Sequence, residues 1–276
     1  MKDCIETARA KINLALHVRA RREDGYHLIE SLFAFADDGD RIAVSAAPEL
    51  RLSLTGPFAA GLDAGEDNLA LRAARAMQAH FGIGRGAAIR LDKRLPVAAG
   101  LGGGSADAAA VARALNRLWG LNAGEADLIA AVGALGADVP VCVASRMVIG
   151  RGIGDEMAPW PGAEALRGRP LLLVNPGAAC PTGPVYRQWD GVDRGALGDD
   201  PAGWRNDLEA GAVALVPVIA QLLTSLRQAD GASLARMSGS GASCFALFGD
   251  AGQRDRAARA IGAAHPGWWT MGGVIG

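Results

Sequence analysis

A glycine-rich stretch in the middle of the chain has the composition of a phosphate-binding loop. Glycines stand at positions 100, 102, 103 and 104, Ser105 follows them, and an alanine-rich helical pattern runs from Ala108 to Trp119. Glycines let successive backbone N–H groups face one ligand, and the start of a helix offers free N–H groups and a positive dipole end to phosphate oxygens. Ser105 is expected to serve as the N-cap of this helix or as a phosphate ligand.

The alternative for this stretch is a flexible turn in front of a helix. Lys93 and Arg94 supply cations just before it, and Pro96 stiffens its entry, so the sequence favours an anion-binding loop. The loop lacks the Gly-Lys-Ser/Thr ending of a P-loop, and no acidic residue follows at the spacing of a dinucleotide-binding fold.

A second group of candidate residues lies on a predicted strand near the N-terminus. From Ala8 to Val18 apolar residues alternate with polar ones, and the polar face carries Arg9, Lys11, Asn13 and His17. This pattern predicts a half-buried strand. Lys11 and Asn13 are neighbours on the polar face and could both point into a cleft, whereas the alternative is an ordinary solvated face.

An Asp-Gly turn after this strand displays two ring side chains. Tyr26 and His27 directly follow Gly25, which supplies the positive φ of the turn. A phenol ring and an imidazole could hold a planar base, although a surface tyrosine and a solvated histidine would explain the same pattern. Another aromatic, Tyr186, ends a stretch from Pro181 that is predicted to be a loop.

Asp138 precedes a predicted helix start. Pro140 suits a first helical position, so Asp138 lies at about the N-cap, where free backbone N–H groups and the helix dipole favour a negatively charged side chain. The alternative is a carboxylate that only caps the helix.

The elements expected to position these residues are mixed strands and helices. A turn is predicted at 37–41, between apolar strands, and a Pro- and Gly-rich linker is predicted at 158–170. The remaining strands are expected at 28–35, 42–44, 50–54, 88–91, from 148, 171–174, 244–248 and 268–271. Of these, 42–44 and 50–54 are expected to be antiparallel. The remaining helices are expected at 68–80, 123–135, 210–226 and 253–264.

Composition limits the classes of partner. The chain has 276 residues, 50% of them hydrophobic, and a net charge of −1, so it offers no broad basic surface for nucleic acid or anionic lipid. The four cysteines form no Cys-x-x-Cys pair, which favours reduced thiols. The charged N-terminus leaves no apolar signal-peptide core, and the uncharged run 210–226 contains Gly211 and Pro217, so we expect a cytoplasmic protein in which this run is a buried helix.

In order along the chain, these motifs resemble those of the GHMP family of small-molecule kinases. The resemblance rests on Ala10-Lys-Ile-Asn-Leu14, Asp24-Gly-Tyr-His27, the stretch from Pro96 to Ala106, Leu135-Gly-Ala-Asp-Val-Pro140, Asn206-Asp-Leu-Glu209 and Ser238-Gly-Ser-Gly-Ala242. It implies an α+β fold of two domains with substrates in the cleft between them. Residues 1–157 would form a ribosomal-protein-S5 domain-2-like domain with the ATP-binding glycine loop, and residues 158–276 a ferredoxin-like domain.

The resemblance also implies roles for individual residues. Lys11 and Asp138 match catalytic residues, whereas Asn13, Tyr26, His27 and Tyr186 match residues that bind the substrate. The residues matched to ATP binding are Pro96, Val97, Ala98, Ala99, Gly100, Leu101, Gly102, Gly103, Gly104, Ser105 and Ala106. Asp107 stands where relatives often have Asn.

The activity implied is ATP-dependent phosphorylation of the C2 hydroxyl of a cytidine diphosphate-linked methylerythritol, in the non-mevalonate isoprenoid precursor pathway. ATP and Mg²⁺ are the implied cofactors, and no residue is identified as the Mg²⁺ ligand. A monomer or weak homodimer is expected, with no nucleic acid or membrane as partner.

Three other functions compete with this one. Homoserine or mevalonate kinase belongs to the same superfamily, but the Asp-Gly-Tyr-His turn argues against both. A ribosomal-protein-like RNA-binding module is expected to be basic, which the net charge of −1 disfavours. A nicotinamide-dependent dehydrogenase would need a βαβ unit around the glycines.

Overall fold

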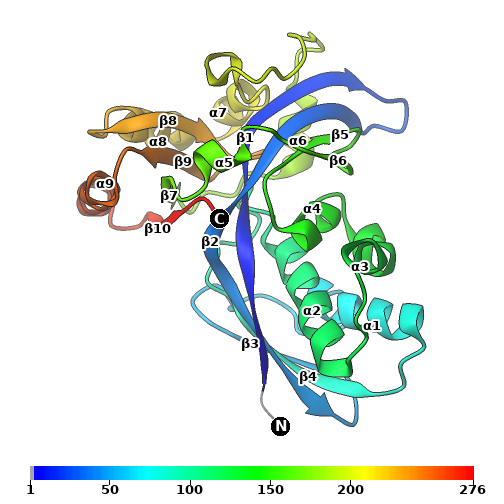
Figure 1. Cartoon of the computed structure of the whole chain (residues 1–276). Helices are drawn as coiled ribbons and strands as arrows, with labels where there is room; N and C mark the ends of the chain where they lie inside the picture. The colour runs from blue at the N-terminus through cyan, green and yellow to red at the C-terminus, as the bar shows by residue number, and fades with distance from the viewer. Residues whose placement is uncertain (1–2) are drawn as a thin grey trace. The chain divides into compact units, whose positions relative to one another are not determined.

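The structure, a computed structural model, describes residues 3–276 (Figure 1). Its strands are β1 Cys4–Arg21, β2 His27–Ala47, β3 Arg51–Thr55, β4 Gly86–Asp92, β5 Val148–Arg151, β6 Glu156–Pro159, β7 Pro170–Asn175, β8 Ala232–Met237, β9 Cys244–Phe248 and β10 Trp269–Val274. Its α-helices are α1 Leu69–Phe81, α2 Gly103–Trp119, α3 Glu125–Val132, α4 Val139–Ala144, α5 Ala163–Leu166, α6 Thr182–Arg187, α7 Glu209–Leu215, α8 Val218–Arg227 and α9 Ala251–Ala264. Two 3₁₀ turns occupy Gly133–Leu135 and Pro201–Gly203.

The chain divides into two compact units, each built from separate stretches. The first unit comprises the chain up to Ala10, Asp38–Val97 and Gly102–Ser145, and the second comprises Lys11–Asp37, Ala98–Leu101 and Arg146–Gly276. Because β1 and β2 run through both units, this division differs from the predicted boundary after residue 157. As a boundary between family domains, that position stays a prediction.

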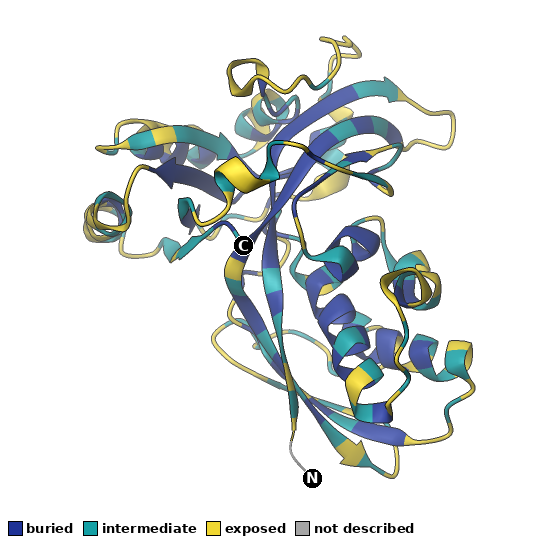
Figure 2. Ribbon diagram, in the orientation of Figure 1, coloured by how far each residue is buried: buried dark blue, intermediate teal, exposed yellow. Residues whose placement is uncertain are grey.

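In the first unit, β4 pairs with two strands and four helices complete the layer beside them. The second half of β2 is antiparallel to β4, and β3 is parallel to β4. The strands expected at 42–44 and 50–54 therefore run antiparallel, as predicted, but they do not pair directly, because β4 lies between them. Helix α2 packs against α1, α3 and α4 and is buried over most of its length (Figure 2).

The turn predicted at 37–41 is wrong, since β2 passes through these residues without a break. A Cβ atom at Gly39 would lie 2.0 Å from the carbonyl oxygen of Ala8, so glycine here permits a close approach of β1 rather than a turn. Asp40 is fully buried and has its own partners within the first unit. Polar residues with buried partners can therefore give the same sequence pattern as an exposed turn.

The expectation of a half-buried N-terminal strand is also wrong, although the strand itself is confirmed. The polar residues Lys11, Asn13 and His17 are 4%, 2% and 1% exposed, so both faces of β1 are covered here. Polar residues on a doubly covered strand must have internal partners, because burying them unpaired would be costly.

The second unit contains a four-stranded antiparallel sheet. The strand order in the sheet is β10-β7-β9-β8. Along the chain, the elements follow one another as strand, helices, strand, strand, helix, strand. That order is typical of the ferredoxin-like fold and confirms the expected domain type. The core beneath the sheet includes Leu172, Val174, Leu222 and Phe248. In the same unit, β5 pairs with β2 and with β6.

Several expected elements of the second unit are confirmed and others are wrong. The strands predicted at 148, 171–174, 244–248 and 268–271 and the helix at 253–264 are present. The predicted linker at 158–170 instead contains the end of β6 and the short helix α5. The predicted loop from Pro181 is helix α6.

The single helix expected at 210–226 is two helices, α7 and α8. They are separated at Val216 and Pro217, because proline lacks the N–H that a continuous helix would need there. No helix within residues 3–276 is long and apolar enough to cross a membrane.

Candidate active site

Lys11 is oriented by a chain of buried hydrogen bonds. Its Nζ atom donates to Oδ1 of Asn13 at 3.0 Å and lies 5.3 Å from the centre of the Phe33 ring. The Asn13 amide donates to the Ser31 hydroxyl at 2.7 Å, which donates to the Ala15 carbonyl at 2.8 Å. The strand thus holds the ammonium group in one place instead of leaving it on a flexible stem.

The first half of the glycine loop is held by β1 and by the late Ser-Gly-Ser-Gly segment. The carbonyl of Leu101 accepts the N–H of Lys11 at 2.9 Å, and the carbonyl of Ala99 accepts the N–H of Ser243 at 3.1 Å. Gly100 has φ +75°, and a Cβ there would lie 2.4 Å from the carbonyl oxygen of Ser238. Glycine is therefore required at position 100 for conformation and for space.

The Asn206 motif supports the same arrangement. Its amide donates to the carbonyls of Met237 and Gly239 at 2.9 and 2.8 Å, and its Oδ1 accepts the N–H of Leu208 at 3.0 Å. The N–H of Asn13 donates to the Ser238 hydroxyl at 3.3 Å. The second unit thus brings together four of the sequence motifs.

The second half of the loop begins helix α2 in the first unit. Gly102 is the N-cap with φ +62°, and the helix starts at Gly103, so the expectation that Ser105 is the N-cap is wrong. The helix starts earlier because residues without a side chain can open it and leave their N–H groups accessible. Val97, Ala98 and Gly104 are exposed, so these loop residues are accessible to solvent.

Below this helix start lies a buried cluster of three charges. Lys93 donates to Oδ2 of Asp40 at 2.5 Å and to Oδ2 of Asp107 at 2.6 Å, and all three side chains are at most 5% exposed. Burial lowers the pKa of Lys93, but the two carboxylates outweigh it and raise that pKa above its ordinary value. Lys93 is therefore a structural cation here, and the expectation that it supplies free positive charge to a ligand is not met.

Asp138 stands at the N-cap of α4, as predicted, with Pro140 in the first turn. Its side chain makes no capping hydrogen bond, so capping does not account for a carboxylate here. The Ser105 hydroxyl lies beside Gly136, in the turn that leads to Asp138. Asp138 belongs to the first unit and Lys11 to the second.

The ring side chains expected to bind the substrate fall into two groups. His27 is 8% exposed and its ring contacts that of Tyr186, with centroids 4.9 Å apart. Tyr26 is 58% exposed at the tip of the turn. Burial, with a smaller contribution from the charge of Arg21, lowers the pKa of His27, which makes the imidazole neutral at pH 7.

The sequence interpretation missed Trp189. Its ring meets that of His27 edge-on at a centroid distance of 5.6 Å, and its buried Nε1 atom has no hydrogen-bond partner among residues 3–276. The spacing of three residues from Tyr186 was the available signal, because residues three apart on a helical turn share a face.

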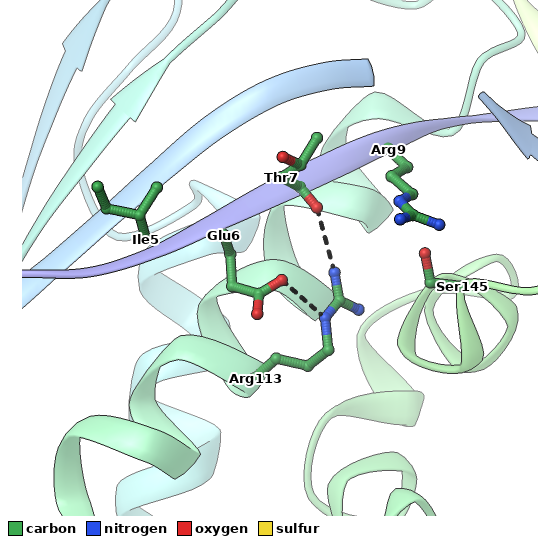
Figure 3. Close-up of a pocket in the computed structure, with 6 residues that line it drawn as sticks. All are labelled: Ile5, Glu6, Thr7, Arg9, Arg113 and Ser145. Atoms are coloured by element: carbon green, nitrogen blue, oxygen red, sulfur yellow. Dashed lines mark hydrogen bonds and ion pairs between the residues drawn. The ribbon is translucent and has the colours of Figure 1, made fainter. Parts of the chain in front are cut away.

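A separate cavity of about 440 Å³ lies in the first unit (Figure 3). It is lined by Ile5, Glu6, Thr7, Arg9, Arg113 and Ser145. Arg113 is already engaged there, since it donates to the Glu6 carboxylate and to the carbonyls of Cys142 and Thr7. None of the predicted site residues lines this cavity.

The described residues contain no group of three His, Cys, Asp or Glu side chains that could hold a metal ion. Mg²⁺ commonly binds through one or two carboxylates together with substrate phosphates, and such a site needs no such group.

Comparisons with known proteins identify the family of the chain. The family model "GHMP kinases N terminal domain" matches residues 68–146, and "GHMP kinases C terminal" matches residues 196–267. A 4-diphosphocytidyl-2-C-methyl-D-erythritol kinase of Rhizorhabdus wittichii is 55% identical over 273 residues, covering 96% of this chain and 92% of that protein. One of Sphingopyxis alaskensis is 51% identical over 281 residues, with 98% of each covered.

A crystal structure of 4-(cytidine 5'-diphospho)-2C-methyl-D-erythritol kinase superposes with a TM-score of 0.84 at 35% identity and covers 99% of both chains. Sequence and fold thus agree over nearly the whole length. The chain belongs to the GHMP kinase family.

Proposed function

We propose that the chain transfers the γ-phosphoryl group of ATP to the C2 hydroxyl of 4-diphosphocytidyl-2-C-methyl-D-erythritol, a step of non-mevalonate isoprenoid precursor synthesis. The observation that carries this proposal is 55% and 51% identity to two kinases named for that substrate, over at least 96% of the chain. The catalysed reaction is therefore an ATP-dependent phosphorylation of an alcohol.

Phosphoryl transfer depends on in-line positioning and on stabilising charge at the moving phosphoryl group. The glycine loop from Pro96 to Ala106 supplies backbone N–H groups and the positive end of α2, which suit the phosphates of ATP. Lys11 supplies a fixed ammonium group, since Asn13 and Phe33 hold it in place. Its role is to stabilise the negative charge that develops on the transferred group.

Asp138 acts as the base that accepts the proton of the C2 hydroxyl. Its carboxylate is half-buried at the start of α4, where the free backbone N–H groups and the helix dipole favour the ionised form that a base needs. A carboxylate is a weak base for an alcohol, so proton transfer comes late and contributes about 10²–10⁴-fold to turnover.

Mg²⁺ is the proposed companion of ATP, and it supplies charge neutralisation at the phosphates. The described residues offer no protein-only cage for it, which fits an ion held mainly by phosphate oxygens and water. We assign no residue of the chain as its ligand.

The cytidine end of the substrate is proposed to bind at the ring side chains of the second unit. His27 keeps one donor and one acceptor in its neutral form, which suits the polar edge of a cytosine. Tyr186 packs against His27, and Tyr26 is exposed on the neighbouring turn, so both rings are accessible to stacking. Asn13 is proposed to contact the substrate in addition to Lys11.

A coupled ADP-release assay tests the function. The purified chain is given ATP with diphosphocytidyl-methylerythritol, mevalonate or homoserine in parallel. We expect ADP release with the first substrate, at least 100-fold faster than with the others, since a site that hydrogen-bonds a polar group rejects analogues lacking it by about 10⁴-fold. Comparable rates with homoserine or mevalonate would assign the chain to another branch of the family.

We further propose that the enzyme is a monomer or weak homodimer of the cytoplasm. Sedimentation at several protein concentrations tests the first statement, and cell fractionation tests the second.

A further inference from the structure

The buried charges of the first unit contact the chain just before the glycine loop and the helix just after it. Asp40 accepts the backbone N–H groups of Arg94 and Leu95 at 2.5 and 2.8 Å, and these residues lead into the loop. Asp107 lies in the first turns of α2, which leaves the loop. A Cβ atom on Gly103 would lie 3.1 Å from Nζ of Lys93, so the cluster lies directly beneath the helix start.

The charges in this cluster do not balance. Two carboxylates share one ammonium group, so the fully ionised cluster carries a net charge of −1 in a place from which water is excluded. Oδ1 of Asp107 is buried without a hydrogen-bond partner among residues 3–276. An unbalanced buried charge with an unsatisfied oxygen is costly, and one added proton makes the cluster neutral.

Among the described residues, no other charged side chain of α2 or of the elements packed on it balances the cluster. Arg113 and Arg117 of α2 pair with Glu6, and Arg90 and Asp92 of β4 pair with Asp3 and Arg94. Helix α1 carries Arg72, Arg75 and His80 on its exposed side, and α3 carries Glu125 and Asp127 on its exposed side. Within α4 there is no charged residue, and Asp138 before it is another carboxylate. The groups that influence the Asp107 carboxyl are Lys93 and Asp40.

We infer that Asp107 carries a proton when the phosphate loop is in its ATP-binding form, and that loss of this proton weakens ATP binding. Asp40, Lys93 and Asp107 are thus positioning residues of the loop. The inference rests on the proposed function, because it assigns the loop to ATP.

Deprotonation of Asp107 has two effects, and both weaken ATP binding. The two carboxylates then repel each other, which loosens the link between Arg94–Leu95 and the first turn of α2. A net negative charge also appears beneath the helix start that faces the phosphates. Burial raises the pKa of the Asp107 carboxyl to about 7, supported by Asp40 and opposed by Lys93, so the change falls in the physiological range.

Calorimetric titration with ATP tests the inference in the unaltered chain and in Asp107→Asn, a neutral isostere of the protonated form. ATP itself ionises with pH, and this affects both titrations equally. The comparison with the variant therefore removes the contribution of ATP. We expect equal dissociation constants at about pH 6 and, at about pH 9, binding by the unaltered chain that is about fivefold or more weaker than by the variant. The matched control is Asp92→Asn, which removes a partly exposed carboxylate beside the same loop and keeps the pH profile of the unaltered chain.

Carbon-13 NMR of aspartate-labelled protein is the second measurement and needs no ATP. One carboxyl should titrate near pH 7 in the unaltered chain and be missing in Asp107→Asn. The same titration should vanish in Asp40→Asn, where one carboxylate and one ammonium group already balance. This second variant keeps the test valid if Asp107→Asn does not fold.

Parallel pH profiles for the unaltered chain and Asp107→Asn, or no aspartate titrating between about pH 6 and pH 8, would overturn the inference. If no variant binds ATP at any pH, the proposed function is wrong and the inference fails with it. If ATP binds with parallel profiles, only the inference is wrong.

Discussion

At the scale of single residues, the two candidate catalytic groups differ in their burial and in the elements that hold them. Lys11 is 4% exposed and tied to Asn13, so its position is set before any substrate arrives. Asp138 is half-buried at the start of a short helix and is not used as its cap. Preorganised charge of this kind stabilises a transition state without reorganisation during the reaction.

Asp138→Asn should lower turnover about 10²–10⁴-fold, because the amide cannot accept the hydroxyl proton. ATP binding by calorimetry and the melting temperature should stay nearly unchanged, since the shape of the side chain is kept. Asp127→Asn is the matched control, because that carboxylate accepts the N–H of Gly124 at the start of α3 and has no catalytic role. Near-normal turnover of Asp138→Asn would leave positioning alone to account for the rate.

Lys11→Met keeps the length of the side chain and removes its charge. We expect turnover to fall by a similar factor, with the Michaelis constant for ATP changed much less, because the ammonium group acts on charge that develops in the transition state. A rise in that constant with unchanged turnover would instead make Lys11 a ground-state ligand of ATP.

Tyr26→Ala tests the proposed cytosine site. Stacking of an aromatic ring on a base is worth about 1–3 kcal/mol, so the Michaelis constant for the cytidylyl substrate should rise roughly 5- to 150-fold. The constant for ATP should stay within about twofold, since Tyr26 is exposed and removing it leaves no cavity in the core. Equal losses for both substrates would indicate damaged folding.

At the scale of elements, the start of α2 combines a proposed ligand site with a packing constraint. Its first residues have no side chains, and the next ones pack against α1 and above the charged cluster. The loop therefore has little room for added atoms, and its tolerance to substitution follows from the distances to its neighbours.

Gly103→Val should weaken ATP binding about 5- to 150-fold while the chain stays folded, because overpacking of this size costs about 1–3 kcal/mol. Gly103→Ala should be milder, since it adds one carbon atom, whose position 3.1 Å from Nζ of Lys93 requires a shift of only a few tenths of an ångström. Calorimetry gives the affinities, and circular dichroism verifies the fold. Unchanged affinity in a folded Gly103→Val protein would reduce the loop to a turn.

At the scale of the whole molecule, the buried proton links stability to pH. The folded-state pKa of Asp107 is raised to about 7 from 3.8, so the folded chain binds more protons than the unfolded chain between these values. Stability is therefore lost as pH rises from about 4 to about 7 and does not change further above that range through this group.

Asp107→Asn removes this loss. Urea unfolding should show a variant that gains stability over the unaltered chain as pH rises from 5 to 7, by about 2–3 kcal/mol, with a nearly constant difference at higher pH. A difference that is the same at all pH values would mean that the carboxyl does not titrate in this range.

The sequence by itself determined the elements whose signal is local. The helix expected at 68–80, the Asp-Gly turn and the strand β9 all depend on residues adjacent in the chain. The motifs with their order and spacing also indicated the family, which the family models and the relatives confirm. The site residues Lys11 and Asp138 were named on this basis, and their roles remain proposals.

Only the tertiary structure decided which polar residues are partners. In the sequence, Gly39 and Asp40 resembled a turn. In the structure, Asp40 pairs with Lys93, and Gly39 allows the backbone of Ala8 to approach closely. Lys93 likewise resembled a free cation until Asp40 and Asp107 were found on either side of it. The physical reason is that burial and pairing depend on residues 14 to 53 positions away in the chain, which no local pattern encodes.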